Sequence, residues 1–450
     1  MKLTRRKFIS ALASTTTLFV SRSKAASLHS PSPPERRPNF IFILADDLGW
    51  GDLSCYGRPD YRTPNLDRLA SQGVKFTNAY SASAVCTPTR CAFFTGRYPA
   101  RLKIGLVEPL TATNHLVGLD PDHPTVASLL KASGYHTALI GKWHLGFRPE
   151  WGPNAHGFDE FFGVLAGAAD YHLHKDGLGH PDLYENLTPV ERNGYLTDLL
   201  TDRAVNYITK RHAAPFYLSL HYTAPHWPWQ DRKGGERVVF TDKTIEPVTM
   251  GGGGSLKLYA EMMRSLDDGV GRVMQALKAA GLDKNTLVFF TSDNGGERFS
   301  YEWPFTGGKG QLFEGGIRVP AIVRWPGMIP ARGVTSQMAI TMDWTATMLA
   351  AARTQPAKDY PLDGIDLLPT ITRAAPLAER TFFWRIGDQD AVRQGKWKYF
   401  RDGARRKLFD LSVDEHEQAD FSATNSDVFE RLSTEFAKWD KQMLPRLKRD

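Results

Sequence analysis

The most regular feature of the sequence is a series of short apolar runs, each followed by polar residues. Residues 39–45 read Asn-Phe-Ile-Phe-Ile-Leu-Ala, and comparable runs lie at 137–140, 216–222, 286–292 and 319–325. A continuous apolar run of this length is typical of a strand that is buried on both faces, as in a parallel sheet. The runs therefore predict a central sheet that is covered on both sides.

Amphipathic helices are predicted between these runs. The clearest pattern has apolar residues at spacings of three and four, at Leu258, Met262, Leu266, Val270, Val273 and Leu277. This spacing places them on one face of a helix, and Gly281 follows where a helix commonly ends. Strands that alternate with helices predict an α/β fold with a large mixed, mostly parallel sheet flanked by helices on both faces.

The pattern changes after about residue 375. Segments 381–386, 391–400 and 407–411 have the composition of short strands joined by Gly and Asp turns, and 428–443 has a helical pattern. We therefore expect a large α/β domain over 39–375. A small α+β subdomain over 376–450 would contain an antiparallel sheet and a helix.

Residues 1–25 have the pattern of an export signal. They combine a basic start, an apolar middle from Phe8 to Val20 and small residues up to Ala25. The twin arginines Arg5 and Arg6 resemble a Tat-type signal peptide, and residues 26–38 are a Pro- and Ser-rich linker. These features predict a periplasmic or secreted protein exported by the Tat machinery; a basic disordered tail is the alternative.

The formal net charge of +7 is concentrated in the same segment. Six basic residues and no acidic residue precede Glu35, and without them the net charge would be about +1. The composition therefore gives no support for binding nucleic acid. No apolar stretch reaches ~18 residues, so we expect no stable membrane anchor in the mature chain.

Charged, amide and imidazole side chains follow four of the apolar runs. They are Asp46 and Asp47, Lys142 and His144, His226, and Asp293 with Asn294. In open α/β sheets, ligands bind beyond the carboxyl ends of the strands. We therefore expect these side chains to converge on one site.

Four of these residues offer oxygen ligands: Asp46, Asp47, Asp293 and Asn294. Such ligands suit Ca²⁺ or Mg²⁺ rather than a soft metal. Each pair taken alone is typical of a solvated turn. Their shared position at strand ends favours a metal site.

A cationic group is predicted beside this metal. It consists of Lys142, His144, His226 and Lys309, the last of which lies between glycines that permit close approach of a ligand. Such a group would bind a tetrahedral anion and could protonate a leaving oxygen. Neither lysine has the spacing of a phosphate loop, so the pattern does not indicate an NTPase.

The sequence has three cysteines, Cys55, Cys86 and Cys91. Three cannot all pair, and no Cys-x-x-Cys spacing supports a zinc ribbon. Cys86 precedes Pro88, which suits the first turn of a helix, and Gly96 suits its end. At the positive end of that helix Cys86 would be a nucleophile, with Arg90 holding it or the anion; a buried apolar residue is the alternative.

Together these motifs resemble the type I sulfatase family of the alkaline phosphatase superfamily. The signature is Cys86-x-Pro88-x-Arg90 with Thr95-Gly96-Arg97 behind it. Other family motifs follow in order as Asp46-Asp47, Gly141-Lys142-Trp143-His144, Pro225-His226, Asp293-Asn294-Gly295, Lys309, Leu362-Asp363-Gly364 and the late segment 407–411. The resemblance runs from about residue 39 to the C-terminus and is similar to bacterial arylsulfatases and N-acetylhexosamine-6-sulfatases. Thr89 and Phe94 depart from the commoner Ser and Leu but keep their chemical character.

The resemblance implies hydrolysis of an aryl or carbohydrate sulfate monoester to an alcohol and inorganic sulfate. It also implies that a separate formylglycine-generating enzyme oxidises Cys86 to formylglycine, whose hydrated aldehyde attacks sulfur and later expels sulfate. The implied Ca²⁺ ligands are Asp46, Asp47, residue 86, Asp293 and Asn294. Arg90 and Lys142 would hold the hydrated aldehyde, His144 would help to eliminate sulfate, and His226 and Lys309 would bind sulfate and assist the leaving oxygen.

Two alternatives belong to different classes. A phosphonate or phosphodiester hydrolase of the same superfamily also acts on a tetrahedral anion, and a non-catalytic protein could bind sulfated glycans. The intact set of Cys86, Arg90 and the cationic group argues against the second alternative. The organic part of the substrate is expected to contact loops 165–195 and 227–254, where six candidates could equally be packing residues: Tyr171, His172, His174, His180, Trp227 and Trp229.

Overall fold

The computed structural model describes residues 37–234, 253–372 and 375–447. All of these belong to one compact unit, Pro34–Asp450. The predicted signal peptide and most of the predicted linker lie outside the described residues. Within the described part of the chain, no helix is both long and apolar enough to cross a membrane.

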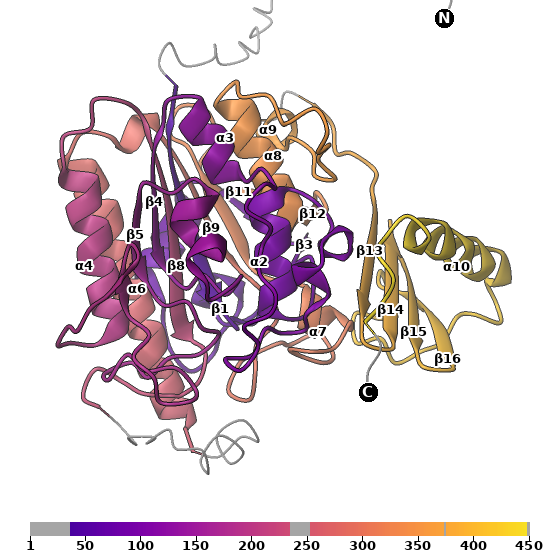
Figure 1. The fold of residues 1–450 in the computed structure, drawn as a ribbon. Coiled ribbons are helices and arrows are strands. Elements are labelled where there is room, and N and C mark those ends of the chain that lie inside the picture. Colours follow the sequence, from indigo (N-terminus) through magenta and orange to yellow (C-terminus); the bar gives the residue numbers. More distant parts are fainter. Residues whose placement is uncertain (1–36, 235–252, 373–374, 448–450) are drawn as a thin grey trace, which may run out of the picture. The chain divides into compact units, whose positions relative to one another are not determined.

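A mixed ten-stranded sheet forms the centre of the molecule (Figure 1). Its strands lie in the order β11 (Gly333–Thr335), β2 (Val74–Phe76), β10 (Ala321–Arg324), β9 (Thr286–Ser292), β1 (Asn39–Asp46), β8 (Phe216–Pro225), β4 (His136–Gly141), β5 (Glu160–Gly163), β6 (Tyr184–Glu185) and β7 (Thr188–Pro189). The central strands from β9 to β5 pair in parallel. The predicted mixed, mostly parallel sheet is therefore confirmed.

Both faces of the sheet are covered by helices, as the continuous apolar runs predict. On β1, alternate residues point to opposite sides: Ile41 and Ile43 join one core, and Phe40 and Phe42 join the other. The first core is closed by α1 (Pro64–Ser71), α4 (Leu196–Thr209) and α6 (Leu256–Ala279), and the second by α2 (Cys86–Thr95), α3 (Val126–Ala132), α8 (Thr341–Ala351) and α9 (Leu368–Ile371). Each large apolar side chain buried here stabilises the fold by roughly 1.5–3 kcal/mol.

A second, four-stranded antiparallel sheet lies toward the C-terminus, and we call it the C-terminal sheet. It consists of β13 (Thr381–Ile386), β14 (Gln389–Gln394), β15 (Trp397–Asp402) and β16 (Arg405–Asp410), followed by α10 (Ser426–Asp440). Leu432, Phe436 and Trp439 of α10 pack into the same core as Trp384 and Leu408 of the sheet.

Two predicted elements differ from the observed ones. The segment 391–400 is not a single strand, because Gly395 has a φ of +55° and turns the chain between β14 and β15. The apolar run at 319–325 forms a shorter strand, β10, which pairs antiparallel with β9 and β2 rather than parallel. An apolar run predicts burial but carries no information on strand direction.

Candidate active site

The polar residues predicted at the strand ends lie at one edge of the large sheet. Strands β9, β1, β8 and β4 are direct neighbours. Their register pairs Ala45 with Ser292, Asp46 with Pro225, and Gly141 with His221. The residues that follow each strand therefore emerge side by side.

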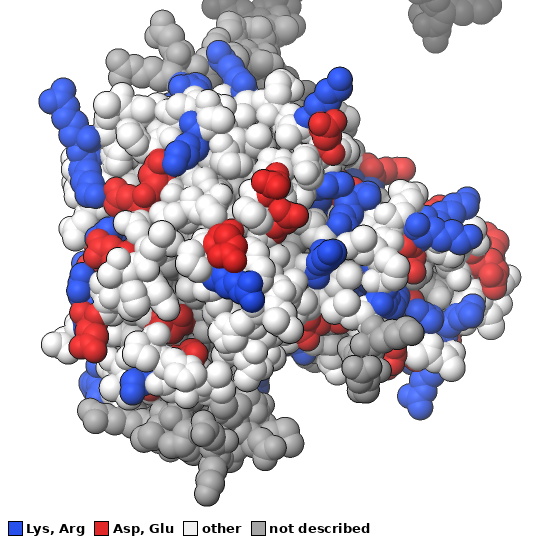
Figure 2. All heavy atoms as spheres, in the orientation of Figure 1, with Lys and Arg blue, Asp and Glu red and all other residues white. Residues whose placement is uncertain are grey.

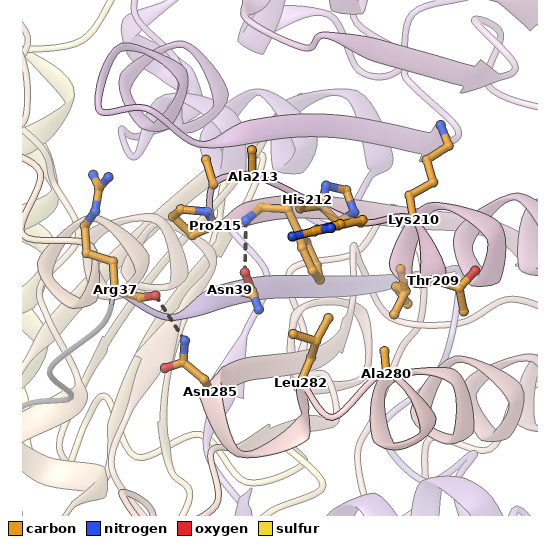
Figure 3. A pocket seen from close by; sticks show the side chains of 14 residues that line it. Arg37, Asn39, Thr209, Lys210, His212, Ala213, Pro215, Ala280, Leu282 and Asn285 are labelled. Carbon is orange, nitrogen blue, oxygen red and sulfur yellow. Dashed lines mark hydrogen bonds between the residues drawn. The ribbon is translucent and has the colours of Figure 1, made fainter.

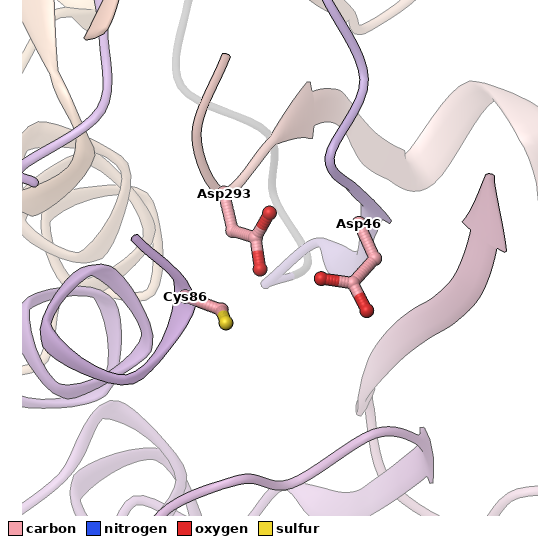
Figure 4. A group of neighbouring side chains, drawn as sticks. All are labelled: Asp46, Cys86 and Asp293. Carbon is pink, nitrogen blue, oxygen red and sulfur yellow. The ribbon is translucent and has the colours of Figure 1, made fainter. Parts of the chain in front are cut away.

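Two carboxylates and the cysteine point at a common space (Figure 4). The ligand atoms of Asp46, Cys86 and Asp293 lie within 4.8 Å of one another, and those of Asp46, Asp47 and His226 form a second group of the same size. All of these side chains are buried. The predicted oxygen ligands thus meet across β1 and β9.

Arg90 and Lys142 neutralise part of this acidic group. Arg90 donates to Asp293 Oδ2 from Nε at 3.0 Å and from Nη2 at 2.8 Å, and its Nη2 lies 3.3 Å from Asp46 Oδ1. Lys142 Nζ donates to Asp46 Oδ2 at 2.6 Å. Both cations are fully buried. Their contacts order the carboxylates, because each buried charge needs a partner.

A second set of contacts surrounds Asp47. Lys309 Nζ donates to Asp47 Oδ2 at 2.7 Å and lies 3.1 Å from Glu297 Oε1. His226 Nε2 is 3.4 Å from Asp47 Oδ2, while Asn294 Nδ2 donates to Asp47 Oδ1 at 2.8 Å. Burial raises the pKa of Asp47, but Lys309 and His226 outweigh burial, so this pKa lies below its usual range.

Both site histidines are held as neutral imidazoles. Burial is the main cause: it lowers the pKa of His226 to about 3 and that of His144 well below its usual value, with Lys309 and Lys142 respectively adding to the effect. The partner carbonyls fix the ring protons. His226 donates from Nδ1 to Trp227 O, and His144 donates from Nε2 to Leu110 O at 2.7 Å. Each ring therefore keeps one nitrogen as an acceptor.

Cys86 is the first residue of α2. The helix ends at Gly96 in the left-handed conformation, so both predicted ends of this helix are confirmed. Burial raises the pKa of the Cys86 thiol to about 11, despite the nearby charges of Lys142 and Lys309. Cys55, Cys86 and Cys91 are all unpaired.

The backbone at the site is locally strained. Asp47 and His144 both have a φ of +60°, which is uncommon for residues other than glycine. Gly141 has a φ of +118°, and a Cβ there would lie 1.8 Å from His221 O. Only glycine fits at this position, which lets the segment 141–144 turn closely against β8 and direct Lys142 inward.

A cavity of about 390 Å³ opens beside these groups. Cys86, His144, His226, Trp227 and Lys309 contribute to its wall, together with the loop segments 109–113, 166–168 and 177–178. Among the six predicted rim residues, only Trp227 lines this cavity. Tyr171, His174 and Trp229 are buried packing residues.

Two buried or half-buried residues of the site were not predicted. His221, within β8, has Nδ1 3.3 Å from Arg90 Nη1, and its Nε2 lies 2.8 Å from Ser219 Oγ. Glu297 pairs with Lys309. An imidazole inside an apolar run and an acid three residues after Asn294 were the available signals. The apolar cavity segments carried no such signal, because they contain no titratable side chain.

A larger cavity, of about 700 Å³, lies at the opposite edge of the sheet, where β1 and β8 begin (Figure 3). Two of its charged residues have partners: Lys210 pairs with Glu160, and Arg37 donates to Ser133 O. On the face seen in Figure 2, acidic and basic side chains lie next to one another over both the large-sheet part and the C-terminal part. The candidate catalytic side chains are therefore concentrated at the edge of the sheet where the carboxyl ends of the parallel strands lie.

Comparison with known proteins agrees with the fold and the motifs. The family model described as Sulfatase matches residues 38–354. N-acetylgalactosamine-6-sulfatase of Rattus norvegicus is 36% identical over 395 residues, which is 82% of this chain and 71% of the relative. Arylsulfatase A of Bos taurus is 35% identical over 430 residues, covering 84% and 77%. The chain belongs to the sulfatase family.

Solved structures extend the likeness over nearly the whole chain. Ps i-CgsB in complex with k-i-k-neocarrahexaose has a TM-score of 0.82 and 31% identity, covering 91% of this chain and 94% of that one. The phosphonate monoester hydrolase of Agrobacterium radiobacter shares the fold, with a TM-score of 0.62 and 21% identity over 91% and 96% of the chains. The sequence relatives are sulfatases, and this protein is accordingly a sulfuric ester hydrolase.

Proposed function

We propose that this sulfatase hydrolyses an aryl or carbohydrate sulfate monoester through formylglycine made from Cys86. The observation that carries the proposal is the meeting of Cys86, Asp46 and Asp293 within 4.8 Å at the start of α2. His144, His226 and Lys309 surround the same cavity. Formylglycine, when formed, supplies a hydrated aldehyde hydroxyl as the nucleophile.

The state of the thiol supports modification. A cysteine acts as a nucleophile in its thiolate form, and burial holds the pKa of Cys86 at about 11. An unmodified Cys86 is therefore protonated at neutral pH and a weak nucleophile. Conversion to formylglycine also explains why a free thiol occupies the catalytic position of an exported protein.

The oxygen ligands fit a divalent cation. Asn294 Oδ1 is buried without a hydrogen-bond partner, and Asp46 Oδ1 has only Arg90 Nη2 beside it, at 3.3 Å; buried oxygens of this kind are costly unless a cation faces them. The donor set of Asp46, Asp47, Asp293, Asn294 and residue 86 is hard and rich in carboxylate, as Ca²⁺ prefers; Mg²⁺ is the alternative. When bound, this ion would lower the proton affinity of the nucleophile and offset charge on the sulfuryl oxygens.

The basic residues of the site have different roles around the sulfate group. Lys142 and Arg90 hold residue 86 and the carboxylates in place, and Lys309 binds sulfate at the cavity wall beside His226. Burial lowers the pKa of Lys309, but Asp47 and Glu297 outweigh burial and hold it well above its usual value. Since neutral His226 presents Nε2 as an acceptor, Lys309 is the group that carries a proton to the leaving oxygen.

His144 acts in the second half of the reaction, in which sulfate is expelled from residue 86. Its Nε2–H is committed to Leu110 O, and its Nδ1 lies 3.3 Å from Thr87 Oγ1 as an acceptor. A neutral acceptor beside residue 86 suits removal of the proton whose loss expels sulfate. The two imidazoles therefore serve as acceptors on either side of the nucleophile.

Domain and export assignments complete the proposal. Residues 39–375 would form the catalytic domain and 376–450 the C-terminal subdomain. Residues 1–25 would direct the folded protein through the Tat machinery to the periplasm or the medium. Export of a folded chain would allow a cytoplasmic formylglycine-generating enzyme to modify Cys86 before translocation.

The test is the mass of the tryptic peptide of residues 76–90, after co-expression with a formylglycine-generating enzyme. We expect the aldehyde at position 86. A known sulfatase matured in the same cells provides the control. If that control carries the aldehyde while Cys86 stays a thiol, the proposed nucleophile is wrong, although membership of the family stands.

A further inference from the structure

The loop that carries Lys309 is attached to the C-terminal sheet and to the segment that follows β16. We call residues 306–316 the Lys309 loop. Leu312 N donates to Gln389 Oε1 of β14 at 2.9 Å, and Thr306 Oγ1 donates to His416 O at 2.5 Å. The ring of Phe313 stacks on Phe400 of β15 with centroids 4.4 Å apart.

A buried cluster of charges fixes the end of the loop. We call it the C-terminal cluster: Glu314, Arg318, Arg393, Lys398 and Glu417. Glu417 Oε2 accepts from Glu314 N at 2.6 Å, and Lys398 Nζ lies between Glu314 Oε1 at 3.1 Å and Glu417 Oε1 at 2.7 Å. Arg318 and Arg393 contact Glu314 Oε2 at 3.2 and 3.4 Å. All five side chains are buried.

The other side of the same loop contacts the site. Gly310 N donates to Ala84 O at 2.8 Å, two residues before Cys86, and Lys309 N donates to Gly296 O at 3.0 Å. Lys309 Nζ then reaches Asp47 and Glu297. The loop is thus a direct link between the C-terminal sheet and the segment that carries the nucleophile.

The Lys309 loop is rigid because it is folded on itself. Gly315 N donates to Thr306 O at 2.8 Å. A Cβ at Gly316 would lie 1.9 Å from Gln311 O, so the chain has no space to adjust there. A displacement of the attachment at Leu312 or Glu314 is therefore transmitted to Lys309, only a few residues away.

We propose that the C-terminal sheet positions Lys309 for proton transfer to the leaving oxygen, with Gln389 and Glu417 as positioning residues. The inference rests on the proposed role of Lys309. It assigns the C-terminal sheet a part in the reaction, because β14 and the segment after β16 hold the loop that carries the ammonium group.

The expected loss of rate depends on how readily the leaving group departs without a proton. A nitrophenolate leaves without a proton, whereas phenolate needs one more strongly, so misplacing the donor slows poor leaving groups most. A misplacement of about 1 Å can cost on the order of 10²-fold in rate. Substrate binding should change less than kcat, since Asp47 and His226 keep their positions.

The experiment measures kcat and KM for 4-nitrophenyl, 4-chlorophenyl and phenyl sulfate with full-length, matured protein. Gln389→Ala removes the acceptor of Leu312 N. Gln394→Ala is the matched control, because Gln394 lies at the other end of β14 and its Nε2 bonds Thr381 Oγ1 within the same sheet at 2.8 Å. Gln389→Glu keeps an oxygen acceptor and tests rescue.

We expect Gln389→Ala to lower kcat on phenyl sulfate by about tenfold or more and on 4-nitrophenyl sulfate by less. Gln394→Ala and Gln389→Glu should stay near wild type. In a Lys309→Ala background, Gln389→Ala should have no additional effect. Glu417→Gln, which keeps an acceptor for Glu314 N but removes the charge facing Lys398, should show the same leaving-group dependence.

Three outcomes would overturn different claims. If Lys309→Ala lowers activity while Gln389→Ala and Glu417→Gln act equally on all three substrates, the C-terminal sheet does not position Lys309, and the proposed function stands. If Lys309→Ala itself keeps wild-type kcat on phenyl sulfate, the proposed role of Lys309 is wrong. If Gln389→Ala lowers kcat further in the Lys309→Ala background, Gln389 acts only as a structural residue.

Discussion

Two buried clusters of charged residues lie at opposite ends of the Lys309 loop, and they differ in how their charges are partnered. In the C-terminal cluster, each carboxylate oxygen faces a cation or a donor. At the site, Asn294 Oδ1 has no hydrogen-bond partner, Asp46 Oδ1 has only Arg90 Nη2 beside it at 3.3 Å, and three aspartates crowd one edge of the sheet. The C-terminal cluster has a partner for every charge, whereas the site has buried oxygen atoms that are left to bind a ligand.

Each cluster holds one carboxyl group with a lowered pKa, Glu314 or Asp47, and one with a raised pKa, Glu417 or Asp293. Burial raises the pKa of Glu314, but Lys398 and Arg393 outweigh burial and bring it to about 2. Burial raises the pKa of Asp293, and the nearby carboxylate of Asp46 adds to this, so it reaches about 7 despite Arg90. The two clusters therefore differ in their surroundings rather than in their pKa values: of the two, only the site borders a cavity in the described part of the chain, and perturbed carboxyl groups beside a cavity indicate a ligand.

The largest loss of activity should come from removing the proposed nucleophile. Cys86→Ala should lower sulfate release by a factor on the order of 10⁶, as expected when a covalent nucleophile is lost. The fold should be retained, because alanine fits at the start of α2. Sulfate release and thermal unfolding, measured on one preparation, check this. Turnover near wild type would refute the assignment of residue 86.

Removing a charge from the C-terminal cluster should lower the stability of the fold, unlike Cys86→Ala. Lys398→Met leaves Glu314 and Glu417 facing each other without their shared lysine and should cost roughly 3–5 kcal/mol of unfolding free energy. Chemical denaturation measures the loss. Adding Glu417→Gln should recover part of it, and a double variant no more stable than Lys398→Met would contradict the electrostatic explanation.

A smaller loss of stability is expected from removing the proposed metal ion. If Ca²⁺ is present at 100 times its Kd, its removal should lower stability by about 3 kcal/mol, with loss of activity. Chelation followed by thermal unfolding, and recovery with Ca²⁺ or Mg²⁺, measures this. Asp293→Asn, which removes one ligand charge, should respond less to the chelator. A protein that contains zinc alone would contradict the argument from oxygen ligands.

Much of the site could be predicted because its residues follow strands that are visible in the sequence. Asp46, Lys142, His226 and Asp293 each follow an apolar run within a few residues, and the structure brings them together at one edge. Their distances and partners could not be predicted, because these depend on side-chain contacts between strands far apart in the chain. His221 was missed because it lies within a strand rather than after one.

The sequence by itself determined the central strands, the ends of α2 and the residue types that carry the chemistry, because local periodicity and helix signals suffice for these. Only the tertiary structure decided the strand order from β9 to β4, the antiparallel direction of β10 and the turn at Gly395. It alone attached the C-terminal sheet to the Lys309 loop. These features arise from pairings across long sequence separations, and packing of the whole molecule selects them.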